Sequence, residues 1–325
     1  MRFSWFPIAL GLCISACTAP HALETTRPND ATRLGRKDAV PGVARCEGAA
    51  LGATQKRGMA MVNVRAEQDP SGPAVVALRV IQSFPRGNAT QDAPKIGHGS
   101  GLLARGVLGV VSIKENGVAR FEIPSGIDVC IQGLDDRGRA IMIVQRVMHI
   151  DGGEVWIPAN VGDRRQSEGN AAKRPEPESP GSYPLSFARL VQPVLDRRCI
   201  GCHDGRSGRP DLRGDLFETE NKAEIPHAAR MAGVESLNDG WTRSYLDLRR
   251  HIPESAADAT GARDSRLMQM LDNGHGGGIP EDDRHAIALW LDCGAPFYGA
   301  YHEADAQARG QLVPPKLGYL PAFEN

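Results

Sequence analysis

The sequence predicts two domains, an N-terminal all-β domain of the sandwich type followed by a mainly α-helical domain. Three observations support this fold class. Short β-rich runs separated by turn residues fill the region from residue 46 to residue 165. A segment with three prolines follows at residues 166–182. Apolar residues then recur at helical spacing in residues 183–303, and a chain of 325 residues is long enough for two cores.

The first residues have the features of an export signal. The apolar run Trp5–Ile14 is too short to span a bilayer. The following Ile14-Ser15-Ala16-Cys17 resembles a bacterial lipobox, in which cleavage precedes the cysteine and lipid is attached to it. We therefore predict a lipoprotein signal peptide at residues 1–16 and lipidation of Cys17. An ordinary signal peptide with an incidental cysteine is the alternative, and both place the mature chain outside the cytoplasm.

Residues 17–45 are predicted to be a flexible tether, because Pro, Thr, Arg and Asp are mixed there and apolar residues show no regular spacing. Thr18 rather than an aspartate follows the lipobox cysteine, which favours the outer membrane. We expect an exported bacterial lipoprotein that faces the periplasm and is attached to the outer membrane through its N-terminal lipid.

The β-rich region contains several strands with turns between them. Ala74–Phe84 is rich in Val, Leu and Ile, and Val118–Ile123 alternates apolar and polar residues as a half-buried strand does. Ala140–His149 is a further β-rich run. Glu115-Asn116-Gly117 and Asp135-Asp136-Arg137-Gly138 supply tight turns. Repeated short strands of this kind predict a β-sandwich or a barrel.

Residues 166–182 are predicted to be an extended, exposed linker because of their prolines and charges. A helix follows, with apolar residues spaced along one face from Phe187 to Leu195. Pro193 lies within it and predicts a kink or a late start near Gln192. This helix leads the chain to residue 199.

Three more helices are expected. Residues 241–252 and 262–271 have short helical patterns. Pro280, followed by three acidic residues, opens a last helix that runs to about Cys293, and Gly294 ends it. Residues 304–325 are predicted to be a C-terminal tail.

The segment Cys199-Ile200-Gly201-Cys202-His203 has the C-x-x-C-H spacing of a c-type haem attachment site. The two thiols add across the haem vinyl groups, and the next residue, His203, serves as the proximal iron ligand. A thioredoxin-like dithiol is the first alternative, but such motifs usually open a helix, where the thiol pKa is lowered. Half of a zinc site is the second, but a second close cysteine pair is missing. The sequence therefore predicts one covalent haem c in a cytochrome c-like domain at residues 183–303.

His275 is the predicted distal ligand of this haem. It lies in the glycine-rich segment between two expected helices, where the backbone has room to bring the imidazole to the iron. Met268 and Met270 are competitors, because small cytochromes also use a thioether ligand. Both methionines follow a helical apolar pattern that core packing explains. An open axial position is the remaining alternative.

The other cysteines require separate assignments. Of the seven in the chain, Cys46 and Cys130 fall in the β domain and form a possible disulfide in an oxidising compartment. Cys293 would be a buried, unreactive thiol. The charge is balanced, with 38 basic and 39 acidic residues, so nothing points to a nucleic-acid partner.

Five stretches of the helical half match one known family. They are Val191–Asp196, Ser265–Met268, Gly274-His275, Trp290–Asp292 and Ala295–Gly299. On these residues the region resembles the C-terminal haem domain of the hydrazine synthase alpha subunit family, and Gly106–Asp135 resembles that family's middle β domain. The resemblance implies bis-histidine ligation through His275, although Gly276 replaces the second histidine of the family's Gly-His-His motif.

Two departures limit what the resemblance implies. The family's middle domain ends in a second C-x-x-C-H, whereas residues 157–165 of this chain contain no cysteine. The family's N-terminal β-propeller has no room before the β domain. The resemblance therefore implies a haem-bearing architecture without hydrazine synthase activity.

The function predicted from the sequence is single-electron transfer with a redox partner protein. The protein is expected to be an electron-transfer protein more than a stand-alone enzyme, and its β domain to be a docking or spacing module. One alternative is a haem enzyme that acts on peroxide or a nitrogen oxide at an open axial site, with Tyr298, Tyr301 or His302 as polar assistants. Another is a non-catalytic haem subunit of a membrane-attached complex.

Overall fold

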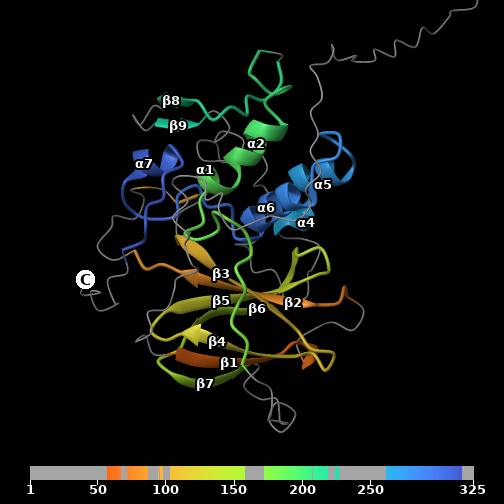
Figure 1. The fold of residues 1–325 in the computed structure, drawn as a ribbon, viewed down its shortest axis with the longest axis vertical. Coiled ribbons are helices and arrows are strands. Elements are labelled where there is room, and N and C mark those ends of the chain that lie inside the picture. The colour runs from red at the N-terminus through yellow and green to blue at the C-terminus, as the bar shows by residue number, and fades with distance from the viewer. Residues whose placement is uncertain are drawn as a thin grey trace, which may run out of the picture. The chain divides into compact units, whose positions relative to one another are not determined.

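The structure of the protein is a computed structural model that describes residues 57–66, 72–86, 94, 96–97, 103–157, 172–206, 208–218, 224–226 and 261–316. Seven strands precede the first α-helix in this part of the chain (Figure 1). They are β1 (Arg57–Asn63), β2 (Ala77–Ser83), β3 (Arg105–Ser112), β4 (Val118–Pro124), β5 (Asp128–Leu134), β6 (Ala140–His149) and β7 (Gly153–Ile157). A short 3-10 helix, Val64–Ala66, follows β1.

These strands form two sheets that face one another. The three-stranded sheet has the order β4-β1-β7, in which β1 is antiparallel to β4 and parallel to β7. The four-stranded sheet has the order β3-β2-β5-β6 and is antiparallel throughout. Apolar residues of both sheets, among them Val62, Val80, Phe121 and Ile131, form one buried cluster between them. The predicted sandwich-like β region is therefore confirmed.

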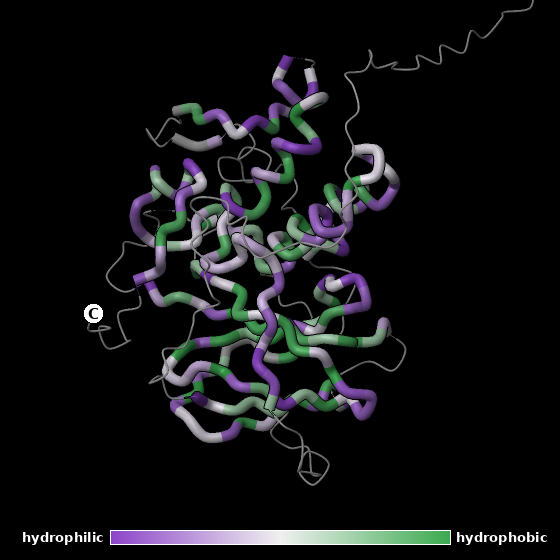
Figure 2. Tube along the Cα trace, in the orientation of Figure 1, coloured by the Kyte–Doolittle hydropathy of each residue, from purple (hydrophilic) through white to green (hydrophobic). Residues whose placement is uncertain are grey.

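The four-stranded sheet is covered on both faces, as the order of layers in Figure 1 shows. Leu78 and Val80 of β2 belong to the core between the sheets. Ile81 and Phe84 belong to a second core that contains the apolar faces of the helices. Figure 2 shows the corresponding hydrophobic residues along the strands of this sheet. A strand buried on both faces needs no polar alternation, which explains the almost continuous apolar run from Ala74 to Phe84.

The described helices are α1 (Phe187–Leu190), α2 (Gln192–Arg198), α4 (Gly261–Asp264), α5 (Arg266–Asp272), α6 (Glu281–Asp292) and α7 (Ala304–Ala308). Two short strands, β8 (Leu216–Glu218) and β9 (Glu224–Pro226), pair with one another. A helical part thus follows the β region, as predicted. The structure adds α7, which lies within the segment expected to be a tail.

Two helix boundaries follow the signals in the sequence. The helical run breaks at Val191, between α1 and α2, so that Pro193 lies in the first turn of α2, where proline is tolerated. Helix α6 begins after Pro280 with three acidic residues in its first turn. It ends at Asp292, and Gly294, two residues further on, has a φ of +87°, which suits a glycine and not an L-residue with a side chain.

The described part of the Pro-rich segment, residues 172–182, is bound to both sheets. Lys173 pairs with Phe121 of β4, and Glu176 pairs with Val110 of β3. The Glu178 side chain is only 5% exposed because it meets a buried arginine of β2. This part of the segment is therefore bound to the β region, with the side chains of Lys173, Arg174 and Glu176 exposed and that of Glu178 buried.

A buried ion cluster connects the four-stranded sheet to the helices. It consists of Arg79 on β2, Gln132 on β5, Glu178 of the Pro-rich segment, and Asp292, the last residue of α6. The side chains of Arg79 and Asp292 are both 0% exposed and lie 3.3 Å apart, and Glu178 accepts a 2.6 Å bond from Arg79. Gln132 accepts a bond from Arg79 and donates one to the Asp292 carbonyl. Burying an arginine is tolerated here because acceptors surround it.

Several predictions concern residues outside the described ranges. These are the signal peptide at residues 1–16, lipidation at Cys17, the tether at 17–45, Cys46 with its expected disulfide, and the helix at 241–252. They stay predictions. Cys130 lies half-buried in β5, and Cys293 is fully buried, which raises the pKa of its thiol to about 12. In the described part of the chain, no helix is sufficiently long and apolar to cross a membrane.

Candidate haem-attachment site

The C-x-x-C-H segment begins where α2 ends. Cys199 caps the helix, and its carbonyl oxygen accepts bonds from the N–H groups of Cys202 at 3.1 Å and His203 at 3.0 Å. The backbone of the segment thus folds into a tight turn that contains both cysteines and the histidine. Cys199 is half-buried against the helical core, and Cys202 is exposed.

A hydrogen bond determines which nitrogen of His203 is available. Its Nδ1 lies 3.1 Å from the carbonyl oxygen of Pro210, and the Leu212 N–H donates to the His203 carbonyl at 3.0 Å. Because a carbonyl oxygen only accepts, Nδ1 carries the proton and donates. The Nε2 lone pair is then available for a metal, and the bond fixes the orientation of the ring.

The helix that carries the motif is held to α6 by charge. Asp283, in the first turn of α6, accepts a 2.6 Å bond from Arg197 and a 2.8 Å bond from Arg198. Burial, together with the Asp283 charge, raises the pKa of the Cys199 thiol. Reactive dithiol motifs depend on a lowered thiol pKa, usually at a helix N-terminus. The position at the end of α2 and the raised pKa both disfavour the thioredoxin-like alternative.

His275 follows the C-terminus of α5 directly. The N–H of Gly274 donates to the Leu271 carbonyl, and the N–H of His275 donates to the Met270 carbonyl at 2.9 Å. These two bonds form a Schellman motif, which requires a left-handed residue after the helix. Gly274 provides it with a φ of +87°. The backbone of His275 is therefore placed by the end of a helix.

The two predicted ligands lie together. The imidazole rings of His203 and His275 have their centroids 5.9 Å apart, with an angle of 68° between the ring planes. Two imidazoles on opposite sides of one metal ion, each bonded at about 2 Å, have ring centres roughly 6 Å apart. The separation of these residues, 72 positions apart in the sequence (275 − 203), thus fits two axial ligands of one iron.

The competing side chains are engaged elsewhere. Met268 is fully buried in the helical core, and Met270 packs against it. The Tyr301 hydroxyl accepts a bond from the Ala104 N–H at 2.9 Å and donates one to the Phe84 carbonyl at 3.1 Å. Tyr298 is buried, which raises the pKa of its hydroxyl to about 12. The two methionines and Tyr298 therefore pack in the core, and Tyr301 connects the helical part to the β region.

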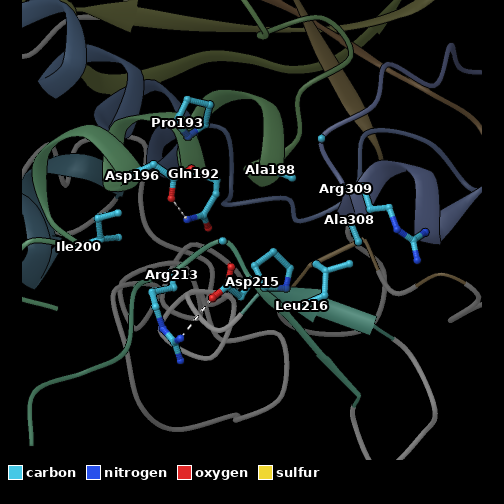
Figure 3. A pocket seen from close by; sticks show the side chains of 13 residues that line it. Ala188, Gln192, Pro193, Asp196, Ile200, Arg213, Asp215, Leu216, Ala308 and Arg309 are labelled. Atoms are coloured by element: carbon cyan, nitrogen blue, oxygen red, sulfur yellow. Dashed lines mark hydrogen bonds and ion pairs between the residues drawn. The ribbon is translucent and has the colours of Figure 1, made fainter. Parts of the chain in front are cut away.

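A cavity of about 610 Å³ lies next to the motif turn, between α2, the start of β8 and the end of α7. Ile200, between the two motif cysteines, is part of its wall. Figure 3 shows two polar pairs beside it, in which Gln192 donates to Asp196 and Arg213 to Asp215. Neither predicted axial histidine is among its described lining residues. The cavity is therefore separate from the histidine pair.

Substitution of Gly274 by alanine tests the placement of His275. No atom lies within 4 Å of the position that a Cβ would take, so the cost comes from the left-handed backbone. We expect the free energy of unfolding to fall by about 1 kcal/mol, the usual penalty for an L-residue in this conformation. Urea unfolding of the variant measures it. Gly201→Ala, at an equally open site without a positive φ, is the matched control and should have little effect.

Sequence reasoning singled out the three defining residues of the motif and His275, but it missed the residues that hold them in place. Pro210 and Asp283 carry no pattern that distinguishes them from other loop or helix residues. Arg197 and Arg198, next to the motif, indicated only that a carboxylate would bind near it. The sequence could not show which aspartate it would be.

Comparisons with known proteins give little further information. No characterised protein family matches the sequence, and no curated protein sequence matches it either. Among solved structures, the chain is similar to hydrazine synthase from Kuenenia stuttgartiensis, with 16% identical residues and a TM-score of 0.48. The similarity covers 75% of this chain and 43% of that one, so this chain spans less than half of its length. This likeness is distant and supports the family resemblance only loosely.

Proposed function

We propose that this protein carries one covalent haem c and transfers single electrons. The observation that supports it most is the pairing of His203 with His275 at a ring separation of 5.9 Å. In this proposal the thiols of Cys199 and Cys202 would hold the haem covalently, and the imidazoles of His203 and His275 would bind its iron. The bound haem would supply one-electron chemistry at its iron.

The surrounding residues suit these roles. The Pro210 carbonyl keeps the proton of His203 on Nδ1 and so presents Nε2 as the ligand atom. The Schellman motif after α5 keeps His275 in place opposite it. If both histidines bind the iron, they would leave no free position on it for a small molecule, which favours electron transfer over ligand chemistry. Two imidazoles also favour a lower potential than a methionine ligand does.

A haem enzyme with an open site is the weaker proposal. It needs polar side chains near the distal face, and the sequence offered Tyr298, Tyr301 and His302 for this role. The Tyr301 hydroxyl is bonded to the backbone of Ala104 and Phe84, and Tyr298 is in the core. Their contacts therefore support the closed, electron-transferring site.

The setting of the proposed function follows from the N-terminal signals. We infer export, attachment to the outer membrane through lipid on Cys17, and electron exchange with a redox partner protein in the periplasm. If the haem has only a structural role in a membrane-attached complex, the isolated protein should be unable to exchange electrons with soluble donors. Stopped-flow reduction by a soluble cytochrome or a small-molecule donor distinguishes the two.

The covalent attachment is tested by expressing the full chain with a c-type haem maturation system. The haem of the unaltered protein should remain with the polypeptide in a denaturing gel and in intact-mass analysis. The double variant Cys199→Ser, Cys202→Ser should lose it, because a hydroxyl does not form the thioether. Cys130→Ala, which removes a cysteine of the β region, is the control and should keep it. A polypeptide that matures without covalent haem would refute the proposal.

A further inference from the structure

The turn between β5 and β6 reaches from the β region to the end of helix α5, close to His275. We call residues 135–140 the hairpin. Its aspartate, Asp135, accepts bonds from the N–H groups of Arg137 at 3.0 Å and Arg139 at 2.8 Å. Gly138 takes a φ of +71° to close the turn. The Asp135 bonds fix the backbone from which the two arginines project.

Arg139 holds the last residue of α5. Its guanidinium binds Asp272 through both oxygens, with Nη1 2.6 Å from Oδ2 and Nη2 2.7 Å from Oδ1. The Arg139 side chain is 8% exposed and that of Asp272 is 28% exposed. Arg137 and Arg284 add longer contacts of 3.4 Å and 3.0 Å to the same carboxylate. Paired bonds of this kind fix direction as well as distance, because the guanidinium is planar.

Asp272 is three residues before His275 and belongs to the same helix end. Asn273, Gly274 and His275 follow it through the Schellman motif, whose bonds return to Met270 and Leu271. A shift of the helix end therefore moves the His275 backbone directly. The hairpin also meets α6, because a Cβ on Gly138 would lie 2.8 Å from the His285 ring and the Ala140 N–H donates to the side chain of Asp292, the last residue of α6, at 2.8 Å. The hairpin is thus held between the ends of two helices.

We propose that the hairpin is a positioning element for the distal histidine and that Arg139 exerts this effect through Asp272. The β region is then more than a docking or spacing module, because its β5–β6 turn sets how firmly His275 is held over the iron. This proposal rests on the proposed function, since it presumes a haem that His203 and His275 share.

The test measures the spin state of the oxidised, haem-loaded full-length protein by absorption and EPR spectroscopy. Arg139→Leu and the milder Asp272→Asn should each raise the high-spin fraction by about tenfold, the factor that corresponds to losing one hydrogen bond to a charged group when that loss is expressed at His275. Arg139→Lys keeps the charge but loses the paired geometry, so an intermediate high-spin fraction is expected.

Arg263→Gln is the matched control. Arg263 binds Asp135 of the hairpin at 3.2 Å and belongs to α4, not to the helix that ends at Asp272. We expect this variant to lower the melting temperature and to leave the spin state unchanged. An equal change of spin state in this control would overturn the proposal, because general docking of the hairpin would then explain the effect. An unchanged spin state in both Arg139→Leu and Asp272→Asn would overturn it as well.

The failure of this inference is distinguishable from failure of the proposed function. If the His275→Ala variant has the same spectrum as the unaltered protein, His275 is not a ligand and the bis-histidine site itself is refuted. If His275→Ala removes the low-spin signal while Asp272→Asn and Arg139→Leu do not alter it, the haem site stands and only the role of the hairpin is refuted.

Discussion

Replacing His275 with alanine should convert the oxidised haem protein from a low-spin to a high-spin form. Two imidazole ligands give a strong ligand field, and alanine leaves one axial position to water or to no ligand. We also expect the reduction potential to rise and cyanide or imidazole to bind the variant rapidly. Low-temperature EPR, near-infrared magnetic circular dichroism and ligand titration measure these changes. Added imidazole should restore the low-spin signal, because it can occupy the vacated position.

His149→Ala is the control for this experiment. His149 lies at the end of β6 with its ring between Asp128 and Asp151, at 2.8 and 3.0 Å. It belongs to the β region, so its removal should leave the haem spectrum unchanged. A low-spin signal that persists in His275→Ala would identify another distal ligand, of which Met270 is the nearest in sequence. A high-spin signal in the unaltered protein would favour the enzyme with an open axial site.

Local patterns in the sequence were sufficient for much of the fold. The run Ala140–His149 became β6 with the same ends, and Val118–Ile123 became most of β4. Pro280 with its acidic neighbours marked the start of α6. These features depend on residues within one turn or one strand, so composition and spacing are enough to detect them.

The rest of the fold depends on contacts between distant residues. Arg79 interrupts an apolar run, and its buried partner Asp292 is 213 residues further along the chain. Asp272 and Arg139 are 133 residues apart. The parallel pairing of β1 with β7 crosses the whole β region. No local pattern specifies which distant charge or strand will be the partner.

The candidate site divides in the same way. C-x-x-C-H is a local motif, and the chemistry of thioether attachment explains each of its residues. His275 was predicted from its glycine-rich surroundings, and the structure brings its ring beside that of His203. The residues that position the two histidines could not be predicted from the sequence. Pro210 contacts His203 through its backbone carbonyl, and Asp272, three residues before His275, forms an ion pair with the distant Arg139.

Replacing Asp292 with alanine should cause the largest loss of stability of any single substitution considered for this protein. The carboxylate accepts bonds from the Ala140 and Ala262 N–H groups, both at 2.8 Å, and lies 3.3 Å from Arg79. Alanine removes the acceptor of both N–H groups, one in a buried bond and one in a partly buried bond, and also one of the acceptors around a buried guanidinium. Breaking a buried pair from one side costs about 3–5 kcal/mol. For a protein of this size the melting temperature should then fall by about 10 °C.

Asp292→Asn separates charge from hydrogen bonding at this position. Its single side-chain oxygen can accept from one of the two N–H groups, so the loss of stability should be smaller than with alanine. Glu154→Ala is the control, because the Arg120–Glu154 pair is about a third exposed and such pairs contribute less than about 1 kcal/mol. Thermal and urea unfolding followed by circular dichroism give the three values. A loss in Asp292→Ala no larger than that in Glu154→Ala would mean that the buried ion cluster does not hold the helices to the sheet. The coupling proposed between the hairpin and His275 would then have no rigid support, because Arg79 also binds the Gly138 carbonyl of that hairpin.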